Sequence, residues 1–344
     1  MSEQVLVSGA NGFIASHSIA QLLEQGKRVI GTVRNPHDET RTEHLRALPG
    51  ADTGLTLVAA DLTADDPFSA YTDVDAILHM ASPYVLNAAD AQKDLVDPAV
   101  KGTVSMLRAA AKSPRVKRVV LTSSMAAITD EPDGRLLSEA DWNDKSTLTR
   151  NAYYYSKTMA ERAAWDFMER EKPGFDLIVI NPFMVIGPAL SSEINTSNQI
   201  LVDVAAGVYP AILALEWGFV DVRDVAEAHV RALTASDANG RYLCAAGNRN
   251  MAELVQLIRK AGAASGKLPS LNLAHGLGTS LMMLASYAQP AGVGSYLRTH
   301  LGRVPRFTNA KIQADLGLRF RDVDQTIIDT VKDLIRLGHM PAAS

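Results

Sequence analysis

Residues 4–15 read QVLVSGANGFIA, an apolar strand that runs directly into a glycine-containing turn. The turn spaces Gly9, Gly12 and Ala15 three residues apart. Gly9 permits a tight turn, Gly12 lets the backbone approach a pyrophosphate, and a small residue at position 15 lets the next helix pack closely on the strand. The helix begins near Gly12, and its first N–H groups face the phosphates. The pattern predicts a dinucleotide-binding unit; the alternative is a strand-to-helix turn without a ligand.

Strand-like and helical segments alternate after this unit. We expect strands at 5–7, 29–33, 55–60, 74–80, 116–122 and 176–181, and helices at 14–23, 39–48, 91–111 and 154–170. Such alternation predicts an α/β protein with a doubly wound parallel sheet of the Rossmann type. Ligands of this fold bind above the carboxyl ends of the strands.

The pattern loosens after Pro182, and a Gly/Pro/Ser-rich stretch at 187–192 marks a boundary. A strand at 219–222 and a helix at 225–233 are expected to rejoin the first unit. We therefore predict a dinucleotide-binding Rossmann domain at 1–182 plus about 217–246. A smaller, mostly helical substrate-binding domain is predicted at 183–216 plus about 247–344.

The composition is that of a globular protein with a substantial core. Of 344 residues, 47% are apolar and 21% are charged, and the net charge of −4 argues against a nucleic-acid partner. A single cysteine, Cys244, excludes an intrachain disulfide and fits a reducing compartment; its apolar neighbours favour a core role over a nucleophile. The histidines lack paired ligand spacing, so we expect no metal. We expect a cytoplasmic monomer or homodimer without a membrane partner.

The stretch between Lys267 and Arg298 contains no charged side chain. Its centre, 281–287, is apolar, but glycines, serines and Pro290 interrupt it, so it is a poor transmembrane span. We expect a buried or substrate-covering helix. A subunit interface and a membrane contact are the alternatives.

Tyr153 and Lys157 stand four residues apart at the start of an expected helix, which places both side chains on one face. A nearby ammonium favours the phenolate and lowers the pKa of the tyrosine. Such a tyrosine can exchange a proton near neutral pH. The alternative is a surface tyrosine without a chemical role.

Ser123 and Ser124 follow the fifth expected strand at its carboxyl end, where a doubly wound sheet places its ligand. A hydroxyl there can donate a hydrogen bond to a carbonyl oxygen as that oxygen gains negative charge. The alternative is a polar turn that ends the strand.

Together these motifs resemble the extended short-chain dehydrogenase/reductases, and most closely their dihydroflavonol-reductase-like group with its microbial aldehyde and ketone reductases. The resemblance covers about residues 4–245. It rests on Gly9-x-x-Gly12-x-x-Ala15, Asp61-Leu62, Thr122-Ser123-Ser124, Tyr153-x-x-x-Lys157 and Asn181-Pro182…Gly187-Pro188. Many extended members have a third glycine where this chain has Ala15, but some reductases of the group carry alanine.

The resemblance implies a role for each matching residue. Tyr153 would be the general acid, Lys157 would lower its pKa and hold the nicotinamide ribose, and Ser124 would polarise the substrate carbonyl. The implied cofactor-binding residues are Gly9, Ala10, Asn11, Gly12, Phe13, Ile14, Arg34, Arg41, Asp61, Leu62, Ala81, Ser82, Thr122, Tyr153, Lys157, Pro182, Val185 and Ser197. The expected substrate-binding residues are Tyr84, Ser124, Met125, Tyr153, Phe183 and Trp217.

The residues after the second strand indicate the cofactor. NAD-binding folds place an acid there for the ribose 2′-hydroxyl, whereas this chain has Thr32-Val33-Arg34 and no acid before Asp38. A guanidinium suits a 2′-phosphate. Arg41 stands where plant relatives carry a second basic residue. We therefore predict NADP(H); the alternative is that Arg34 is a solvated loop charge.

The sequence predicts an NADPH-dependent reductase that converts a ketone or aldehyde to an alcohol, reversibly. Two alternatives share the fold. One is a sugar-nucleotide epimerase or dehydratase that retains its nicotinamide cofactor. The other is a regulator that senses a dinucleotide without catalysis. Such regulators commonly lose the tyrosine or the lysine, and this chain keeps both.

Overall fold

The computed structural model describes residues 3–82, 90–264 and 266–343. Its centre is a seven-stranded sheet in the order β10-β7-β5-β4-β1-β2-β3, and every pair of neighbours is parallel. This is the doubly wound order, extended by one strand, so the predicted fold class is confirmed. The strands are β1 (Gln4–Ser8), β2 (Arg28–Val33), β3 (Leu55–Ala59), β4 (Ala76–His79), β5 (Arg118–Thr122), β7 (Asp176–Pro182) and β10 (Gly240–Cys244).

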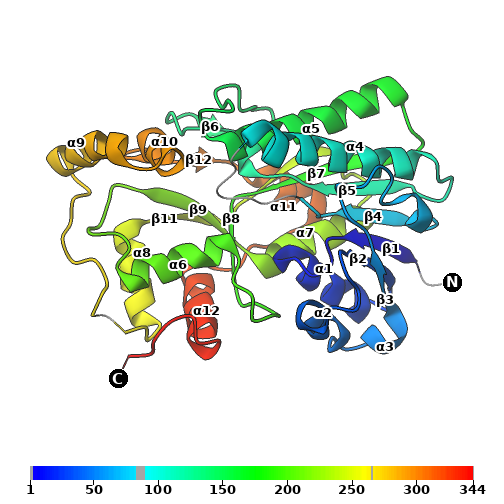
Figure 1. Cartoon of the computed structure of the whole chain (residues 1–344), viewed down its shortest axis with the longest axis horizontal. Helices are drawn as coiled ribbons and strands as arrows, with labels where there is room; N and C mark the ends of the chain where they lie inside the picture. Colours follow the sequence, from blue (N-terminus) through cyan, green and yellow to red (C-terminus); the bar gives the residue numbers. More distant parts are fainter. Residues whose placement is uncertain (1–2, 83–89, 265, 344) are drawn as a thin grey trace.

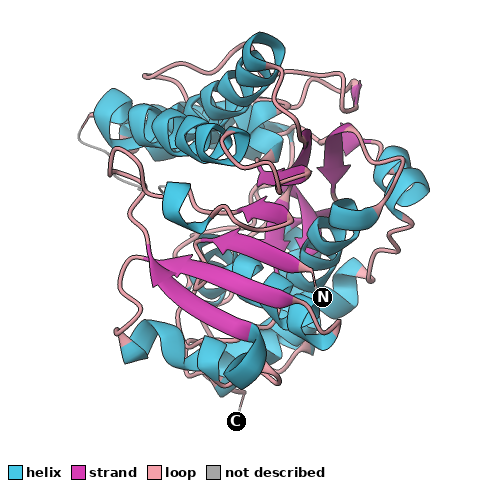
Figure 2. Cartoon of the chain, turned by 90° about the vertical axis from the view of Figure 1, so that its right-hand side faces the viewer, coloured by secondary structure: helices cyan, strands magenta, loops and turns pink. Residues whose placement is uncertain are grey.

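Helices cover both faces of this sheet (Figures 1 and 2). On one face α1 (Phe13–Glu24) packs against α7 (Val222–Thr234), and on the other α4 (Asp97–Ala111) packs against α5 (Ala152–Glu171). Side chains alternate between the two layers: Val5 and Val7 join the core under α1, whereas Leu6 joins the core under α4. Burial on both faces explains why the strands read as continuous apolar runs. Two shorter helices, α2 (Glu39–Arg46) and α3 (Ala51–Gly54), connect β2 to β3.

A second cluster of elements has its own apolar core beside the large sheet (Figure 1). A three-stranded sheet, β11-β9-β8, packs with α6 (Thr196–Ala206), α8 (Met251–Lys260) and α12 (Val323–Arg336). Its strands are β8 (Met184–Ile186), β9 (Glu216–Asp221) and β11 (Gly247–Asn250). A two-stranded pair joins β6 (Leu136–Leu137) to β12 (Arg306–Phe307), and α11 (Ala310–Leu316) follows β12.

Several expected elements differ in detail. The helix expected at 91–111 is divided into a π-helix, Gln92–Val96, and α4, because Pro98 lies in the first turn of α4 and cannot donate a backbone hydrogen bond. The strand expected at 219–222 is β9, which pairs within the small sheet, whereas α7 and β10 join the large one. Short 3₁₀ turns at Ser69–Tyr71, Met125–Ala127 and Ser286–Ala288 were not expected. The two-domain division remains a prediction.

The uncharged stretch forms α9 (Gly276–Ala285) and α10 (Ala291–His300). The expected burial is wrong for α9, which lies at the outer edge of the molecule (orange, Figure 1), whereas its expected role in covering a substrate stays a prediction. Its side chains Leu277, Leu281 and Leu284 are 86%, 59% and 71% exposed. By contrast α10 buries Leu297, Thr299 and His300. Within the described ranges, none of the helices combines the length and apolar character needed to cross a membrane.

Candidate active site

The carboxyl ends of β1, β4, β5 and β7 bring four predicted segments to one edge of the sheet. Ser8 pairs with His79, and Thr122 pairs with Ile180, so the residues after each strand leave the sheet side by side. The residues that follow these strands are Gly9, Met80, Ser123 and Phe183. The order reverses between β1 and β4, which is the position where doubly wound sheets open a ligand crevice.

The glycine turn has the geometry that its sequence predicts. Gly9 adopts φ +67°, and a Cβ on it would lie 3.0 Å from the Cα of Ala81. The N–H of Gly12 donates to the Gly9 carbonyl at 2.8 Å, which closes the turn. Gly12 is the exposed N-cap of α1 and has no side chain, so the N–H groups of the first turn are left for an anion. Asn11, Phe13 and Ile14 border this turn, and these features fit a pyrophosphate.

Lys157 of α5 links the helix to the segment after β4. Its Nζ donates to Ser82 Oγ at 2.8 Å and lies 5.8 Å from the ring centroid of Tyr153, one helical turn earlier on α5. Burial lowers the pKa of the Lys157 ammonium to about 8, because desolvation disfavours the charged form. The predicted residues Ala81, Ser82, Thr122 and Lys157 line one small cavity of about 10 Å³, the space of about one water molecule.

Ser124 is the second residue after β5. It is extended and caps the turn at Met125–Ala127, where its Oγ accepts from the Ala126 N–H at 3.2 Å. Its carbonyl oxygen accepts a 3.1 Å hydrogen bond from Asn181 Nδ2. Ser124 is half-buried. These contacts fix the position of Ser124 and leave its hydroxyl proton to donate. A hydroxyl held in this way is suited to stabilising a developing oxyanion.

The N-terminus of α5 is anchored just before Tyr153. Asn151 adopts φ +49°, and its Nδ2 donates to Asp130 and, at 3.2 Å, to Thr299 Oγ1 of α10. The ring of Tyr154 lies edge-on to His300, their centroids 6.0 Å apart, and His300 stacks on Tyr296 at 4.0 Å. The sequence did not predict this contact between α5 and α10, because nothing in the local pattern relates residues 148 positions apart.

Arg34 and Arg41, which are predicted to distinguish NADP(H) from NAD(H), are exposed at the end of β2 and in α2. Arg34 lies near Asp61 and adds to the lowering of the Asp61 pKa, which comes first from its hydrogen bonds to Thr63. Arg41 lies 3.6 Å from Glu193 and 4.0 Å from Asp38, which caps α2. Arg34 directly follows the carboxyl end of β2, the strand beside β1, and Arg41 lies in the first turn of α2. Their role toward a 2′-phosphate remains a prediction.

The other predicted residues occupy separate elements around the same edge. Pro182 ends β7, Val185 is buried in β8, and Ser197 lies in the first turn of α6. Leu62 contacts α4 near Gly102. The roles of these residues remain predictions.

The expected substrate residues are mostly packed against protein. Phe183 lies 4.6 Å from Phe307, ring to ring, and Trp217 donates to Tyr296 Oη at 2.8 Å. Both are buried, whereas Met125 is half-buried. Tyr84 lies outside the described residues. Substrate roles for these side chains remain predictions.

The sequence reasoning also missed a buried polar cluster behind Ser123. Glu161 accepts from Ser123 Oγ at 2.5 Å, from Asn181 Nδ2 at 2.7 Å and from Arg241 Nε at 2.5 Å. The signal was available: Glu161 is a charged residue four positions after Lys157, on the same helix face. Glu161 and Ser123 line the cavity that also contains Lys157.

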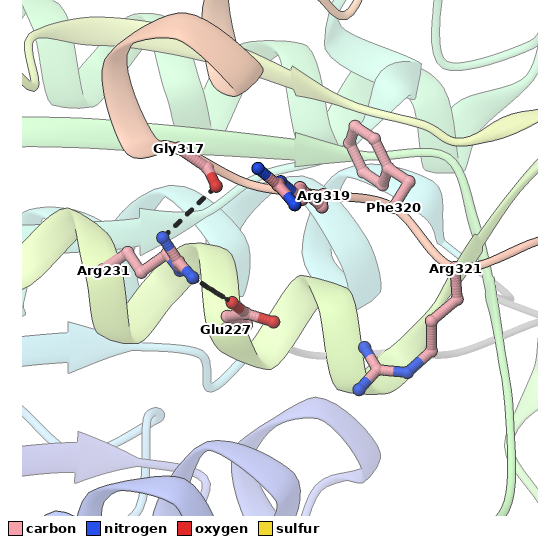
Figure 3. Close-up of a pocket in the computed structure, with 6 residues that line it drawn as sticks. All are labelled: Glu227, Arg231, Gly317, Arg319, Phe320 and Arg321. Atoms are coloured by element: carbon pink, nitrogen blue, oxygen red, sulfur yellow. Dashed lines mark hydrogen bonds and ion pairs between the residues drawn. The ribbon is translucent and has the colours of Figure 1, made fainter.

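A larger open groove of about 630 Å³ lies elsewhere, between α7 and the segment after α11 (Figure 3). Two of the three arginines in its lining already have protein partners: Arg231 bonds to Glu227 and to the Gly317 carbonyl, and Arg321 bonds to Asp224. The motif residues are not part of its lining. Volume alone therefore does not locate the chemistry, and the small cavity at the sheet edge is the better candidate.

Comparison with known proteins agrees with this geometry. Residues 5–245 match the model of the NAD dependent epimerase/dehydratase family. The chain is 37% identical to cinnamoyl-CoA reductase 1 of Arabidopsis thaliana over 342 residues, which is 98% of this chain and 90% of that protein. It is 34% identical to the ketoreductase azaE of Aspergillus niger, with 97% of this chain and 98% of that protein covered.

Solved structures of reductases also match this chain, over nearly its full length. Gre2 of Candida albicans in complex with NADPH superposes with a TM-score of 0.80 and 32% identity, covering 97% of this chain and 99% of that chain. The yeast methylglyoxal/isovaleraldehyde reductase Gre2 with NADPH gives a TM-score of 0.76 and 27% identity over 97% and 99%. The resemblance predicted from the motifs is confirmed: the chain belongs to the NAD dependent epimerase/dehydratase family, within the extended short-chain dehydrogenase/reductases.

Proposed function

We propose that this protein is an NADPH-dependent reductase that converts a ketone or aldehyde to an alcohol, and that it also runs the reverse oxidation. The observation that carries the proposal is the half-buried Lys157, whose ammonium bonds to Ser82 beside the carboxyl ends of β4 and β5, one turn after Tyr153. The solved relatives that bind NADPH and the reductase names of the curated relatives support it.

The cofactor would be held by the glycine turn, by the N-terminus of α1 and by Lys157. When bound, its nicotinamide supplies the hydride. The exposed Arg34 and Arg41 would pair with the 2′-phosphate, since a guanidinium forms charge-assisted hydrogen bonds to phosphate. This assignment favours NADPH over NADH.

The side chains would move one proton and stabilise one charge. Tyr153 donates its phenolic proton to the oxygen that becomes the alcohol, and Lys157 favours the resulting phenolate. Ser124 donates a hydrogen bond to the same oxygen as it becomes negative. In the oxidation direction the same groups act in reverse.

Replacing Tyr153 with phenylalanine tests the proposal. We expect Tyr153→Phe to bind NADPH as the unchanged protein does and to lose about 100-fold or more in kcat with a panel of ketones and aldehydes, since general acid catalysis contributes about 10²–10⁴-fold. Tyr155→Phe on the same helix is the matched control and should keep its turnover. Undiminished turnover of Tyr153→Phe would remove the proposed acid.

Two other functions give different results in the same assay. An epimerase or dehydratase would act on a sugar nucleotide without net consumption of NADPH. A dinucleotide sensor would bind NADPH without turnover on any carbonyl compound. Net NADPH oxidation that depends on an added ketone or aldehyde supports the reductase over both.

A further inference from the structure

Glu161 is a buried carboxylate that the proposed proton transfer does not use. It lies one helical turn after Lys157 on α5, the helix above the sheet in Figure 1, and its side chain is fully buried. Burying a carboxylate is costly unless the site supplies partners. Its surroundings therefore indicate why the position holds an acid.

One oxygen of Glu161 holds the segment that carries Ser124. Oε2 accepts from Ser123 Oγ at 2.5 Å and from Asn181 Nδ2 at 2.7 Å. Asn181 Nδ2 also donates to the Ser124 carbonyl at 3.1 Å. Glu161 thus restrains Ser123 directly and Ser124 through Asn181.

The other oxygen is held from the sheet edge. Arg241 of β10 donates from Nε to Oε1 at 2.5 Å, and its guanidinium stacks on Trp142 with Cζ 3.8 Å from the ring centroid. Arg241 also donates to the carbonyls of Glu139 at 2.9 Å and Asp141 at 2.6 Å. Glu161 is therefore fixed between β5, β7 and β10 and cannot easily follow a displaced Ser123.

The partners of Glu161 match a side chain that accepts hydrogen bonds at both oxygens. Ser123, Asn181 and Arg241 all donate to Glu161, and Trp165 Nε1 adds a weaker contact at 3.4 Å. A carboxylate accepts at both oxygens, whereas an amide must present a donor to one side. Glutamine would therefore point an N–H group at either Arg241 or the Ser123–Asn181 pair.

We propose that Glu161 is a positioning residue of this active site. Its carboxylate holds Ser123 and, through Asn181, the backbone of Ser124, so that the Ser124 hydroxyl meets the reacting oxygen. This inference rests on the proposed function, because it requires Ser124 to stabilise that oxygen. Glu161 itself does not touch the substrate.

The alternative is that the Glu161–Arg241 pair only stabilises the fold. Buried ion pairs can often be replaced by apolar residues with little loss of stability, whereas removal of one partner leaves an uncompensated charge. Apolar side chains cannot accept hydrogen bonds from Ser123 and Asn181. Stability and positioning can therefore be separated by experiment.

A double-mutant cycle between Glu161→Gln and Ser124→Ala tests whether Glu161 acts through Ser124. We expect Glu161→Gln alone to lower kcat by about 10- to 100-fold, since small displacements of a reacting group cost about that much, with the KM for NADPH within about twofold. In the Ser124→Ala background the same change should lower kcat by less than about twofold, because the group it positions is gone. Glu169→Gln, an exposed carboxylate on α5, is the matched control.

The paired variant Glu161→Met with Arg241→Met separates positioning from folding. We expect its thermal midpoint to rise above that of Glu161→Met alone, because no charge is left unpaired, while kcat stays as low as in Glu161→Met. Recovery of kcat together with the midpoint would overturn the proposal. The proposal would also be overturned if Glu161→Gln lowered kcat by the same factor in the unchanged protein and in the Ser124→Ala background. If Ser124→Ala by itself leaves kcat unchanged, the role of Ser124 in the proposed function fails and the positioning role fails with it.

Discussion

Lys157 Nζ and Ser82 Oγ, from α5 and from the segment after β4, form a 2.8 Å hydrogen bond at the carboxyl edge of the sheet. The contact joins two residues that are 75 positions apart in the chain. It orients the ammonium beside Tyr153, whose ring centroid is 5.8 Å away. The parallel order of β4 and β5 makes this contact possible, because both strands end at the same edge.

Removing the Ser82 hydroxyl should lower the pKa of Lys157 further and so reduce activity. Burial already lowers the pKa of Lys157 to about 8, and Ser82→Ala removes an acceptor that favours the charged form. We expect kcat/KM to fall by about tenfold, the effect of losing a hydrogen bond to a charged group, and the alkaline limb of its pH profile to move below about pH 8. An unchanged alkaline limb would show that this hydrogen bond does not control the ammonium. Ser113→Ala, in the loop after α4, is the control.

Arg34→Ala should shift the preference between the two cofactors. We expect kcat/KM for NADPH to fall by about 10- to 100-fold, while the value for NADH changes by less than about threefold, because only NADPH carries the 2′-phosphate. Arg28→Ala at the opposite end of β2 is a matched control, being also an exposed arginine. Equal losses with both cofactors would mean that Arg34 does not recognise the phosphate.

Two buried histidines should make the folded state sensitive to acid. Burial lowers the pKa of His79 to about 3 and that of His229 to about 4, well under the unfolded value of 6.5. Between about pH 6.5 and 4 the unfolded chain therefore binds more protons than the folded one, so the free energy of unfolding falls as the pH falls. Each histidine contributes a slope of about 1.4 kcal/mol per pH unit in this window.

Comparing the free energy of unfolding of a histidine variant and of the unchanged protein isolates the contribution of that histidine to the pH dependence. Urea unfolding at a series of pH values should show His229→Asn with a shallower dependence than the unchanged protein. His37→Asn, at an exposed loop position, should keep the full dependence. Parallel curves for His229→Asn and the unchanged protein would mean that His229 gains its proton in the folded state.

Two leucines on helices should differ sharply in their effect on stability. Leu107 of α4 is 1% exposed, so Leu107→Ala should cost about 2–5 kcal/mol through lost burial and the cavity left behind. Leu284 of α9 is 71% exposed, so Leu284→Ala should change the free energy of unfolding by less than about 0.5 kcal/mol. Denaturant midpoints measure both. A large loss for Leu284→Ala would mean that α9 is covered in solution.

Much of the fold, and the pair proposed here for proton transfer, could be predicted from the sequence. The glycine turn and the apolar runs at 29–33 and 176–181 identify the wound sheet, because burial on both faces and a φ of +67° at Gly9 restrict residue type locally. Tyr153 and Lys157 were found because helical periodicity relates neighbours four residues apart.

Other features depend on contacts between distant segments. Only the tertiary structure showed that β9 pairs in a second sheet, that α9 exposes its leucines and that Glu161 joins Ser123, Asn181 and Arg241. The sequence by itself determined which residues are suited to strands and turns and which pair could exchange a proton, since these follow from side-chain shape and short-range spacing. Folding decided which of them meet, because hydrogen bonds across 20 to 80 positions depend on the winding of the whole sheet.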